Sequence, residues 1–334
     1  MSPVLEEYLA AVSVGDRAGA LDLVRRLQKD GASPLEVMTG VIAPAQARVG
    51  ELWASDAWSV AQEHAATAVS EAVLGMLGAQ IPAPLDTSSP VVVTCVEQEW
   101  HALPALLVAE HLRSAGIPVS YLGANASAEH LVRHVHEVGP RAVALSCSLS
   151  ASLPRVRRQI EAVRATGTPV VVGGAAFDRP GRRAQALGAT GFAVSGAEAV
   201  SAVEALPAAT RPAEPLTHPW AEEGFAIHAD REPLTAALRE RVAGNRPADS
   251  LEDVLSGWQP ALLDHLPHLV GALAGALVAG DRTVVEEAAV WLEDVMSHRD
   301  APRGTIHVVM GELRTLVREY PSASELLSAL PAAG

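Results

Sequence analysis

The chain lacks the basic clusters that mark proteins acting on nucleic acids. Lys and Arg together number 25 against 39 Asp and Glu, so the formal net charge is −14, and no block of basic residues interrupts this acidic surplus. Phosphate neutralisation needs clustered cations, and we therefore expect no direct binding of nucleic acid. The N-terminus is acidic rather than signal-like, and no apolar run reaches about 20 residues, which predicts a cytoplasmic protein without a membrane span.

Cysteine and aromatic residues are also scarce. The two cysteines, Cys95 and Cys147, each lie in a strand-like apolar run, which predicts buried thiols rather than a disulfide. Aromatic residues make up only 4% of the 334 residues, whereas apolar residues reach 49%, enough for the cores of two or three domains. Each of the six tryptophans therefore invites an explanation.

The N-terminal part, residues 1–80, has apolar positions at helical spacing throughout. Glycines at positions 15 and 31 end the first two helical stretches, and Ser33–Pro34 is a typical start for the third. Four helices joined by short turns predict an antiparallel four-helix bundle. Residues 81–90 are rich in Pro and Ser and read as a linker.

The hydrophobic period changes in the next domain, residues 90–206. Short runs rich in β-branched residues alternate with helical stretches; the runs cover residues 91–96, 117–123, 142–148, 169–174 and 190–194. Continuous apolar strands separated by helices indicate a parallel sheet covered on both faces. Five such units predict a small doubly wound α/β domain in flavodoxin-like strand order.

Ligands of such sheets bind beyond the carboxyl ends of the strands. His101 follows the first predicted strand, in the sequence EQEWHALP. The hydroxyl-rich stretch SCSLS follows the third, and Gly173–Gly174 ends the fourth, where missing side chains let a ligand approach the backbone. These three stretches define a candidate binding edge.

This combination resembles the cobalamin-binding domain family, whose members carry an acidic-x-His-x-x-Gly motif after the first strand, a hydroxyl-rich stretch after the third and Gly-Gly after the fourth. The resemblance implies that His101 is the lower axial cobalt ligand and that Glu99 is its hydrogen-bond partner. It also implies that the nucleotide tail of the cofactor lies among Ser146, Ser148, Ser150, Gly173 and Gly174.

Three positions depart from the family pattern. Pro104 replaces the glycine of the motif, which changes the expected loop geometry. Ser148 stands where the family usually has Leu. The acidic residue is Glu99 rather than Asp, which fits the light-sensing branch of the family better than the methyltransferase branch.

Residues 53–64 carry a second pattern, Trp-x9-Glu-His, formed by Trp53, Glu63 and His64. It is similar to the helical cap of the light-sensing cobalamin repressors, where these residues cover the upper axial face around a 5′-deoxyadenosyl group. The resemblance implies adenosylcobalamin as the bound form of vitamin B12. Ala54 stands where many of those repressors place a cobalt-trapping His, which leaves His64 as the candidate upper cobalt ligand after photolysis.

A second Pro-rich linker, residues 205–219, precedes a helical C-terminal domain, residues 220–332. This domain contains His265, His268 and Trp291, together with further His and Arg residues. We expect Trp291, Val295, His298 and Arg299 to share one helix face.

The order of the three domains resembles the photocobilins, bacterial photoreceptors whose C-terminal globin- or phycobiliprotein-like domain holds a bilin. The resemblance implies a biliverdin held noncovalently, because neither cysteine lies in this domain. Arg299 or Arg303 would hold its propionates, and Asp294, His298 or His307 would meet its pyrrole nitrogens. A haem with one of these histidines as axial ligand is the alternative.

The sequence therefore predicts a light-responsive cobalamin photoreceptor that is not an enzyme and that signals to a downstream protein or regulator, with self-association into a homo-oligomer left open. Two alternatives come from other classes. One is a corrinoid carrier of a methyltransferase system, which must open its upper face to partner enzymes. The other is a cobalamin-dependent transcriptional antirepressor that binds a protein partner.

Overall fold

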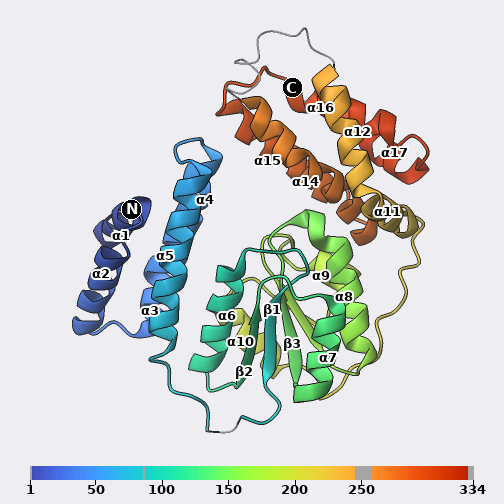
Figure 1. The fold of residues 1–334 in the computed structure, drawn as a ribbon. Coiled ribbons are helices and arrows are strands. Elements are labelled where there is room, and N and C mark those ends of the chain that lie inside the picture. The colour runs from blue at the N-terminus through green and yellow to red at the C-terminus, as the bar shows by residue number, and fades with distance from the viewer. Residues whose placement is uncertain (1, 86, 245–257, 330–334) are drawn as a thin grey trace. The chain divides into compact units, whose positions relative to one another are not determined.

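The computed structural model describes residues 2–85, 87–244 and 258–329, which fold into two compact units (Figure 1). The first unit runs through Ser146 and also contains Val163–Gly174 and Thr190–Arg211. The second contains Cys147–Ala162, Ala175–Ala189 and the chain from Pro212 onward.

The first unit begins with a helical segment. Its helices are α1 (Pro3–Ser13), α2 (Arg17–Lys29), α3 (Pro34–Val37), a π-helical turn (Met38–Ile42), α4 (Ala43–Ala54) and α5 (Val60–Gly78). Polar side chains cap the first turns: Ser33 and Glu36 form a reciprocal capping box at α3, which confirms the start predicted there, and Ser59 and Gln62 form another at α5. These caps fix where the helices begin.

One apolar core holds this segment together. It includes Tyr8, Met38, Ile42 and Leu74, all fully buried, and Leu103 from the next domain packs into the same core. The helical segment and the α/β part of the first unit therefore share buried surface. The arrangement of these helices as a four-helix bundle that caps a cofactor stays a prediction.

A five-stranded parallel sheet forms the centre of the α/β part. Its strands are β1 (Val91–Cys95), β2 (Val119–Gly123), β3 (Ala142–Ser146), β4 (Val170–Gly173) and β5 (Gly191–Ala193), in the order β2-β1-β3-β4-β5. All neighbours pair in parallel, and β1 and β3 are buried along their whole length. The predicted doubly wound sheet and its strand order are confirmed.

Two helices pack together on this sheet: α6 (Ala102–Ser114) after β1, and α10 (Gly196–Glu204) after β5. Their apolar residues form one core with Val91, Val93 and Cys95 of β1. Helix α7 (Ala128–Val138) joins β2 to β3. Both cysteines are free and buried, as predicted.

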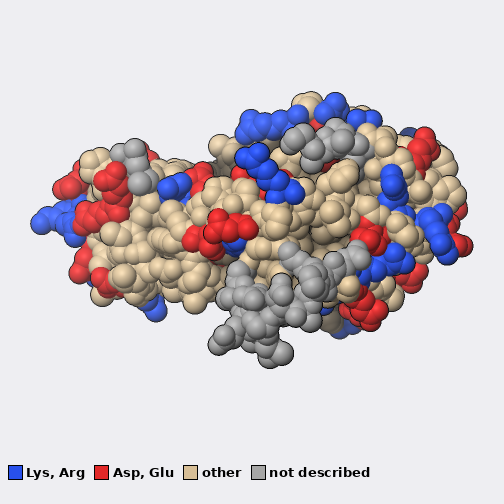
Figure 2. All heavy atoms as spheres, turned by 90° about the horizontal axis from the view of Figure 1, so that it is seen from above, with Lys and Arg blue, Asp and Glu red and all other residues tan. Residues whose placement is uncertain are grey.

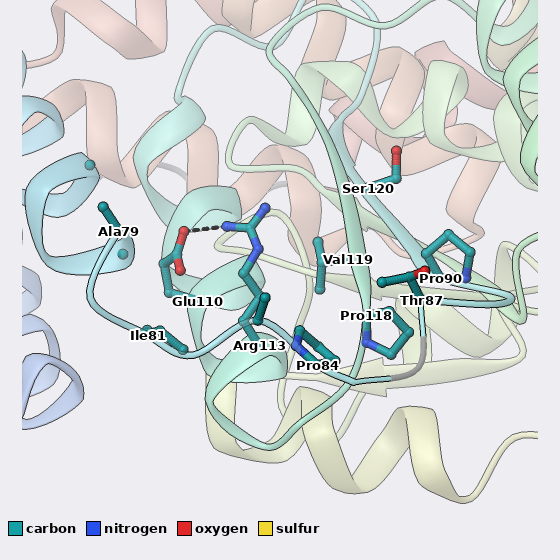
Figure 3. Close-up of a pocket in the computed structure, with 13 residues that line it drawn as sticks. Ala79, Ile81, Pro84, Thr87, Pro90, Glu110, Arg113, Pro118, Val119 and Ser120 are labelled. Atoms are coloured by element: carbon teal, nitrogen blue, oxygen red, sulfur yellow. Dashed lines mark hydrogen bonds and ion pairs between the residues drawn. The ribbon is translucent and has the colours of Figure 1, made fainter.

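A cavity of about 670 Å³ opens at the amino ends of β1 and β2, opposite the predicted ligand edge. Pro90 and Pro118, which precede these two strands, line it together with Glu110 and Arg113 of α6 (Figure 3). Glu110 and Arg113 form an ion pair, which Figure 3 shows as a dashed line. Burial raises the pKa of the Glu110 carboxyl although Arg113 acts to lower it.

The carboxylate of Glu110 lies directly against Gly78, at the end of α5. A Cβ atom on Gly78 would lie 2.8 Å from Glu110 Oε1, whereas a Cβ on Gly75, one turn earlier, would meet nothing within 4 Å. Because Gly78 has no side chain, the buried carboxylate of Glu110 on α6 fits directly against α5.

This contact predicts opposite effects for two alanine substitutions in one helix. Gly75→Ala should raise the free energy of unfolding by about 0.5–1 kcal/mol, because it removes backbone entropy from the unfolded chain. Gly78→Ala should lower it by about 1–3 kcal/mol, because the new methyl group displaces the Glu110–Arg113 pair. Urea unfolding of the two variants measures the difference. Equal effects of the two substitutions would contradict the contact.

The second unit is helical. Beyond the 3₁₀ turn η2 (Ser150–Ser152), it contains α8 (Leu153–Ala165, of which the last three residues belong to the first unit) and α9 (Arg182–Ala186). Its C-terminal helices are α11 (Trp220–Ala229), α12 (Arg231–Gly244), α14 (Trp258–Ala279), α15 (Thr283–Ser297), α16 (Thr305–Leu316) and α17 (Pro321–Ser328). Part of the helical stretch expected over residues 251–266 lies outside the described residues. The likeness of this part to globins or phycobiliproteins stays a prediction.

Helix α14 is the core helix of this unit. It contacts α11, α12, α15 and η2 along its length. Two glycines allow a close approach to η2: a Cβ on Gly271 would lie 2.6 Å from the Cβ of Ala151, and one on Gly275 would lie 2.5 Å from the carbonyl oxygen of Ser150. Pro267 lies within the helix, so the sequence before and after it forms one element.

By length and composition α14 could cross a membrane, which corrects the prediction that no apolar run is long enough. However, 67% of its most apolar window is buried inside the protein. A core helix of a folded domain gives the same signal.

A buried arginine ties α9 to the α14–α15 turn. Arg183 is only 2% exposed, and its guanidinium bonds Asp281 at 2.8 Å, Glu287 at 2.7 Å and the hydroxyl of Thr283 at 2.8 Å. A buried cation needs such partners, because an unpaired one would cost several kcal/mol. The C-terminal helices are thus fixed to the segment that contains α9.

His228 of α11 is a buried histidine in an environment that opposes its charge. Nδ1 has no hydrogen-bond partner among the described residues. Burial first, and then the positive charges of Arg155, Arg158 and Arg231, lower its pKa to about 4. The imidazole is therefore neutral in the folded protein near pH 7.

This histidine should make stability depend on pH in the acidic range. In the unfolded chain it titrates near 6.5, so below that pH the unfolded state takes up a proton that the folded state refuses. The contribution of His228 to stability is complete above pH 6.5, declines as the pH falls and is fully lost only below about pH 4.

When the pH falls from 7.5 to 4.5, His228 should lower the unfolding free energy of the parent chain by about 2 kcal/mol. The His228→Leu variant should not show this part of the decrease. Urea unfolding at the two pH values measures it, with the exposed His130→Leu as the control. An unchanged pH dependence in His228→Leu would show that the folded protein tolerates the charge.

Candidate functional site

The loop after β1 holds His101 at the carboxyl edge of the sheet. Glu99 is fully buried, and its Oε1 accepts hydrogen bonds from the backbone N of His101 at 3.1 Å and from Nδ1 of the same residue. The His101 side chain is 55% exposed. Glu99 therefore holds Nδ1 of His101. No described residue bonds Nε2, which is left for a ligand.

The charge of Glu99 also determines the protonation of this imidazole. The hydrogen bond to Glu99 raises the pKa of His101 against the opposing effect of burial, and the negative charges of Glu99 and of Glu63 add to the rise. Leu103, two residues after His101, packs into the apolar core of the helical segment, so this segment and the loop after β1 are neighbours.

A neighbouring loop stiffens this arrangement. Asn125, in the loop after β2, accepts a hydrogen bond from the backbone N of Gln98 at 2.8 Å and donates its own backbone N to the carbonyl of Glu99 at 3.1 Å. Gln98 and Asn125 both have left-handed backbones, with φ of +61° and +55°. Such strained residues persist where the surroundings hold them, and they gather at functional sites. Sequence reasoning missed both residues.

Glu63 belongs to a hydrogen-bond chain that anchors it to α4. Its Oε1 accepts from the hydroxyl of Thr67 at 3.1 Å, and that hydroxyl accepts from Nε2 of Gln46 at 2.6 Å. Its Oε2 pairs with Nδ1 of the exposed His64. Glu63 and His64 lie in the first turn of α5, because the helix begins at Val60.

Trp53 lies in the last turn of α4, half-buried, where the chain turns toward α5. Its carbonyl accepts the backbone N of Asp56 at 3.1 Å, and Asp56 has a left-handed φ of +59°. Helices α4 and α5 pack against each other. The predicted roof over a cofactor therefore consists of residues on two packed helices, and its contact with a cofactor stays a prediction.

The predicted tail-pocket residues fall in different parts of the structure. Ser146 ends β3 and pairs with Cys95 on one side and Gly173 on the other, so three strand ends meet there. Ser148 and Ser150 belong to the second unit, where the backbone of Ser150 packs on Gly275 of α14.

Backbone geometry explains why both Gly173 and Gly174 are glycines. A Cβ on Gly173 would lie 2.5 Å from the carbonyl of Ala193, and Gly174 has a φ of +108°. Strand pairing and a turn therefore require glycine at both positions. Their contact with a cofactor stays a prediction.

Trp291 and Val295 lie one turn apart in α15, His298 is its C-cap, and Arg299 follows and donates to the carbonyl of Val295. Val295 is fully buried and Trp291 is 41% exposed. Helix α15 ends at Ser297, so only the first two of these four residues lie within it, and their shared face stays a prediction. Asp294 and His298 are exposed neighbours one turn apart, and Arg303 and His307 lie at the start of α16.

Three aromatic side chains meet elsewhere in the second unit. The ring of His265 lies 5.4 Å from that of Trp291 and 5.8 Å from that of His268, with the rings tilted by 51° and 46°. His265 and His268 come from α14, and Trp291 comes from α15. The sequence showed these residues, but only the packing of two helices brings them together.

The donor set around His101 restricts the kind of metal that fits. Within the described ranges no group of three or more His, Cys, Asp or Glu side chains could hold a metal ion. A bare transition metal needs three or four protein ligands. A single oriented imidazole instead suits a metal that brings its own equatorial ligands, as cobalt does in a corrin ring.

Comparisons with known proteins agree with this donor set. A B12 binding domain model matches residues 89–204, and a second B12 binding domain model matches residues 4–77. The chain contains B12-binding domains. The matched ranges cover the His101 loop and the helices that carry Trp53, Glu63 and His64, so both halves of the candidate site lie within them.

Individual relatives support the same conclusion. The chain is 34% identical over 175 residues to the HTH-type transcriptional repressor CarH of Myxococcus xanthus, a match that covers 51% of this chain and 57% of the relative. The chain thus spans little more than half the length of that protein.

One solved structure of a corrinoid protein is similar in fold. The monomethylamine corrinoid protein of Methanosarcina barkeri matches with a TM-score of 0.53 and 17% identity, over 61% of this chain and 98% of that one. A cobalamin-binding protein from Desulfitobacterium hafniense matches at 22% identity over 59% of this chain and 95% of that one, with a TM-score of 0.32.

Without His101, the B12-binding domain should lose its protein ligand to cobalt. With hydroxocobalamin, His101→Ala should give a base-off spectrum or no bound cofactor. Glu99→Gln, which keeps the shape of the side chain, should raise the Kd about 10- to 100-fold because the imidazole loses its orienting carboxylate. Absorbance titration measures both, with His130→Ala on the exposed face of α7 as the control. An unchanged spectrum in His101→Ala would remove the cobalt-ligand assignment.

Proposed function

We propose that this protein is a light-responsive adenosylcobalamin sensor rather than an enzyme, and that it signals through a change in association with a regulator or with a second copy of the chain. The observation that carries the proposal is the Glu99–His101 pair at the carboxyl edge of the sheet, next to Leu103, which packs into the core of the helical segment. A cofactor held by His101 would thus lie beside the helical segment that carries Trp53, Glu63 and His64.

Glu99 and His101 would act on the lower face of the cofactor, and Glu63 and His64 on its upper face. Glu99 orients His101 from the buried side, so that Nε2 offers a lone pair to cobalt. Gln46 and Thr67 hold Glu63 in place, and Glu63 pairs with His64. Adenosylcobalamin, when bound, supplies a weak cobalt–carbon bond that absorbs visible light.

The helical segment would report the loss of the upper group. Trp53 lies on α4, and Glu63 and His64 lie on α5, so a bulky group beneath them determines how these two helices rest on the domain below. A change of this kind acts as a switch only if the two states make different contacts. His64, being exposed and close to Glu63, is the candidate for the freed cobalt position.

The second unit would hold a bilin, with biliverdin as the expected chromophore. The support is the cluster of His265, His268 and Trp291, which brings one indole and two imidazoles together where α14 packs on α15. We now propose these three residues, together with Arg303 and His307, as the bilin-binding set; haem is the competing ligand.

A sensor that does not bind nucleic acid directly would need a protein partner. The formal charge is −14, and on the face seen in Figure 2 the basic side chains form small groups among neutral and acidic ones. A protein regulator is therefore the proposed receiver of the signal, in the cytoplasm. The resemblance to a repressor covers only part of that protein's length.

The test compares dark and illuminated samples of the full chain loaded with adenosylcobalamin. Green light should abolish the adenosylcobalamin bands and shift the elution volume on size-exclusion chromatography. With biliverdin supplied as well, a protein-shifted red band should appear. A chain that prefers methylcobalamin and elutes identically in light and dark would instead be a corrinoid carrier, and the sensor proposal would fail.

A variant separates the upper face from the lower one. Trp53→Ala should weaken adenosylcobalamin about tenfold, because an indole packed on the adenosyl group is lost. It should leave the Kd of hydroxocobalamin unchanged, because that form has no bulky upper group. Equal losses for both forms would show that Trp53 only supports the fold.

A further inference from the structure

The loop that presents His101 also presents an exposed tryptophan. Trp100 is 71% exposed, whereas its neighbour Glu99 is fully buried. An indole of this size seldom faces water in a folded domain, because burying it is worth several kcal/mol. The roles of Glu99 and His101 do not require the indole of Trp100.

The backbone around Trp100 is fixed on both sides. Before it, Asn125 bonds the backbone of Gln98 and of Glu99. After it, the backbone N of His101 is bonded to Glu99, and the backbone N of Ala102 donates to the carbonyl of Trp100 at 2.8 Å. The indole therefore leaves a rigid loop, at the residue directly next to the candidate cobalt ligand.

We propose that Trp100 is the apolar seat of the corrin ring, on which the lower face of cobalamin packs while His101 binds the cobalt. A corrin is much wider than an imidazole, so a ring centred on His101 extends over the adjacent residue, whose Cα is only about 3.8 Å away. The underside of the ring presents apolar edges and amide groups. An indole matches both, with its face and with its N–H.

This role makes Trp100 a positioning residue that acts on affinity. The loop offers a directional bond from His101 and apolar contact area from Trp100, and the rigid backbone means that neither group loses backbone freedom when the cofactor arrives. The inference rests on the cobalamin part of the proposed function and does not depend on light.

Hydroxyl-radical footprinting of the full chain tests the seat directly. The probe is hydroxocobalamin in the dark. Its binding should slow the oxidation of Trp100 at least fivefold, while Trp291, which is 41% exposed in the second unit, should react at an unchanged rate. Bound hydroxocobalamin with Trp100 still fully reactive would overturn the proposal, and would indicate instead a surface for a protein partner.

Substitutions give an independent measure. Trp100→Ala should raise the Kd of hydroxocobalamin about tenfold without changing the spectrum of the bound form, because His101 still binds cobalt. Trp100→Phe should restore most of the affinity, and Val14→Ala, at a comparably exposed apolar position in the helical segment, should have no effect. An unchanged Kd in Trp100→Ala would also refute the seat.

The two proposals fail separately in these experiments. If Trp100 is protected in the dark but light has no effect on the adenosylcobalamin complex, the sensor proposal fails and the seat remains. If light acts as expected and Trp100 is never protected, the seat fails and the sensor remains.

Discussion

The candidate site depends on one interaction, between the buried carboxylate of Glu99 and the exposed imidazole of His101. A carboxylate without water around it must find donors, and here it takes two from the same histidine, one from the backbone and one from the ring. The bond therefore fixes both the loop and the direction of Nε2. The other features of the site, from the Asn125 bridge to the charge of Glu63, act on a group that Glu99 has already oriented.

Helix α5 connects the two edges of the sheet domain. Its first turn carries Glu63 and His64 toward the edge with His101, and its last residue, Gly78, meets Glu110 at the opposite edge. Its 19 residues form a rod of about 28 Å. A rigid helix anchored at one end by steric contact and at the other by charge is suited to convert a change beneath its first turn into a change of tilt.

The sequence allowed the sheet, its strand order, the free cysteines and the cap at Ser33 to be predicted, because these follow from local periodicity and from the rules of parallel sheets. The loop after β1 was placed correctly at the carboxyl edge of the sheet, but its stiffness depends on the hydrogen bonds of Asn125 and on the left-handed backbones of Gln98 and Asn125, which no periodic pattern reveals. The end of α15 at Ser297, before His298 and Arg299, was not recognised in the sequence. The cluster of His265, His268 and Trp291 depends on the packing of α14 against α15, which a single sequence does not encode in any local pattern.

The two glycines of α14 have a consequence for how this chain can change over evolution. Gly271 and Gly275 let the helix lie on the backbone of Ala151 and Ser150, in the segment that follows β3. A shortened descendant without the C-terminal helices would expose that backbone to water, and a substitute helix would fit only with equally small residues at both positions. The hydroxyl-rich segment and the glycines of α14 therefore constrain each other's sequence.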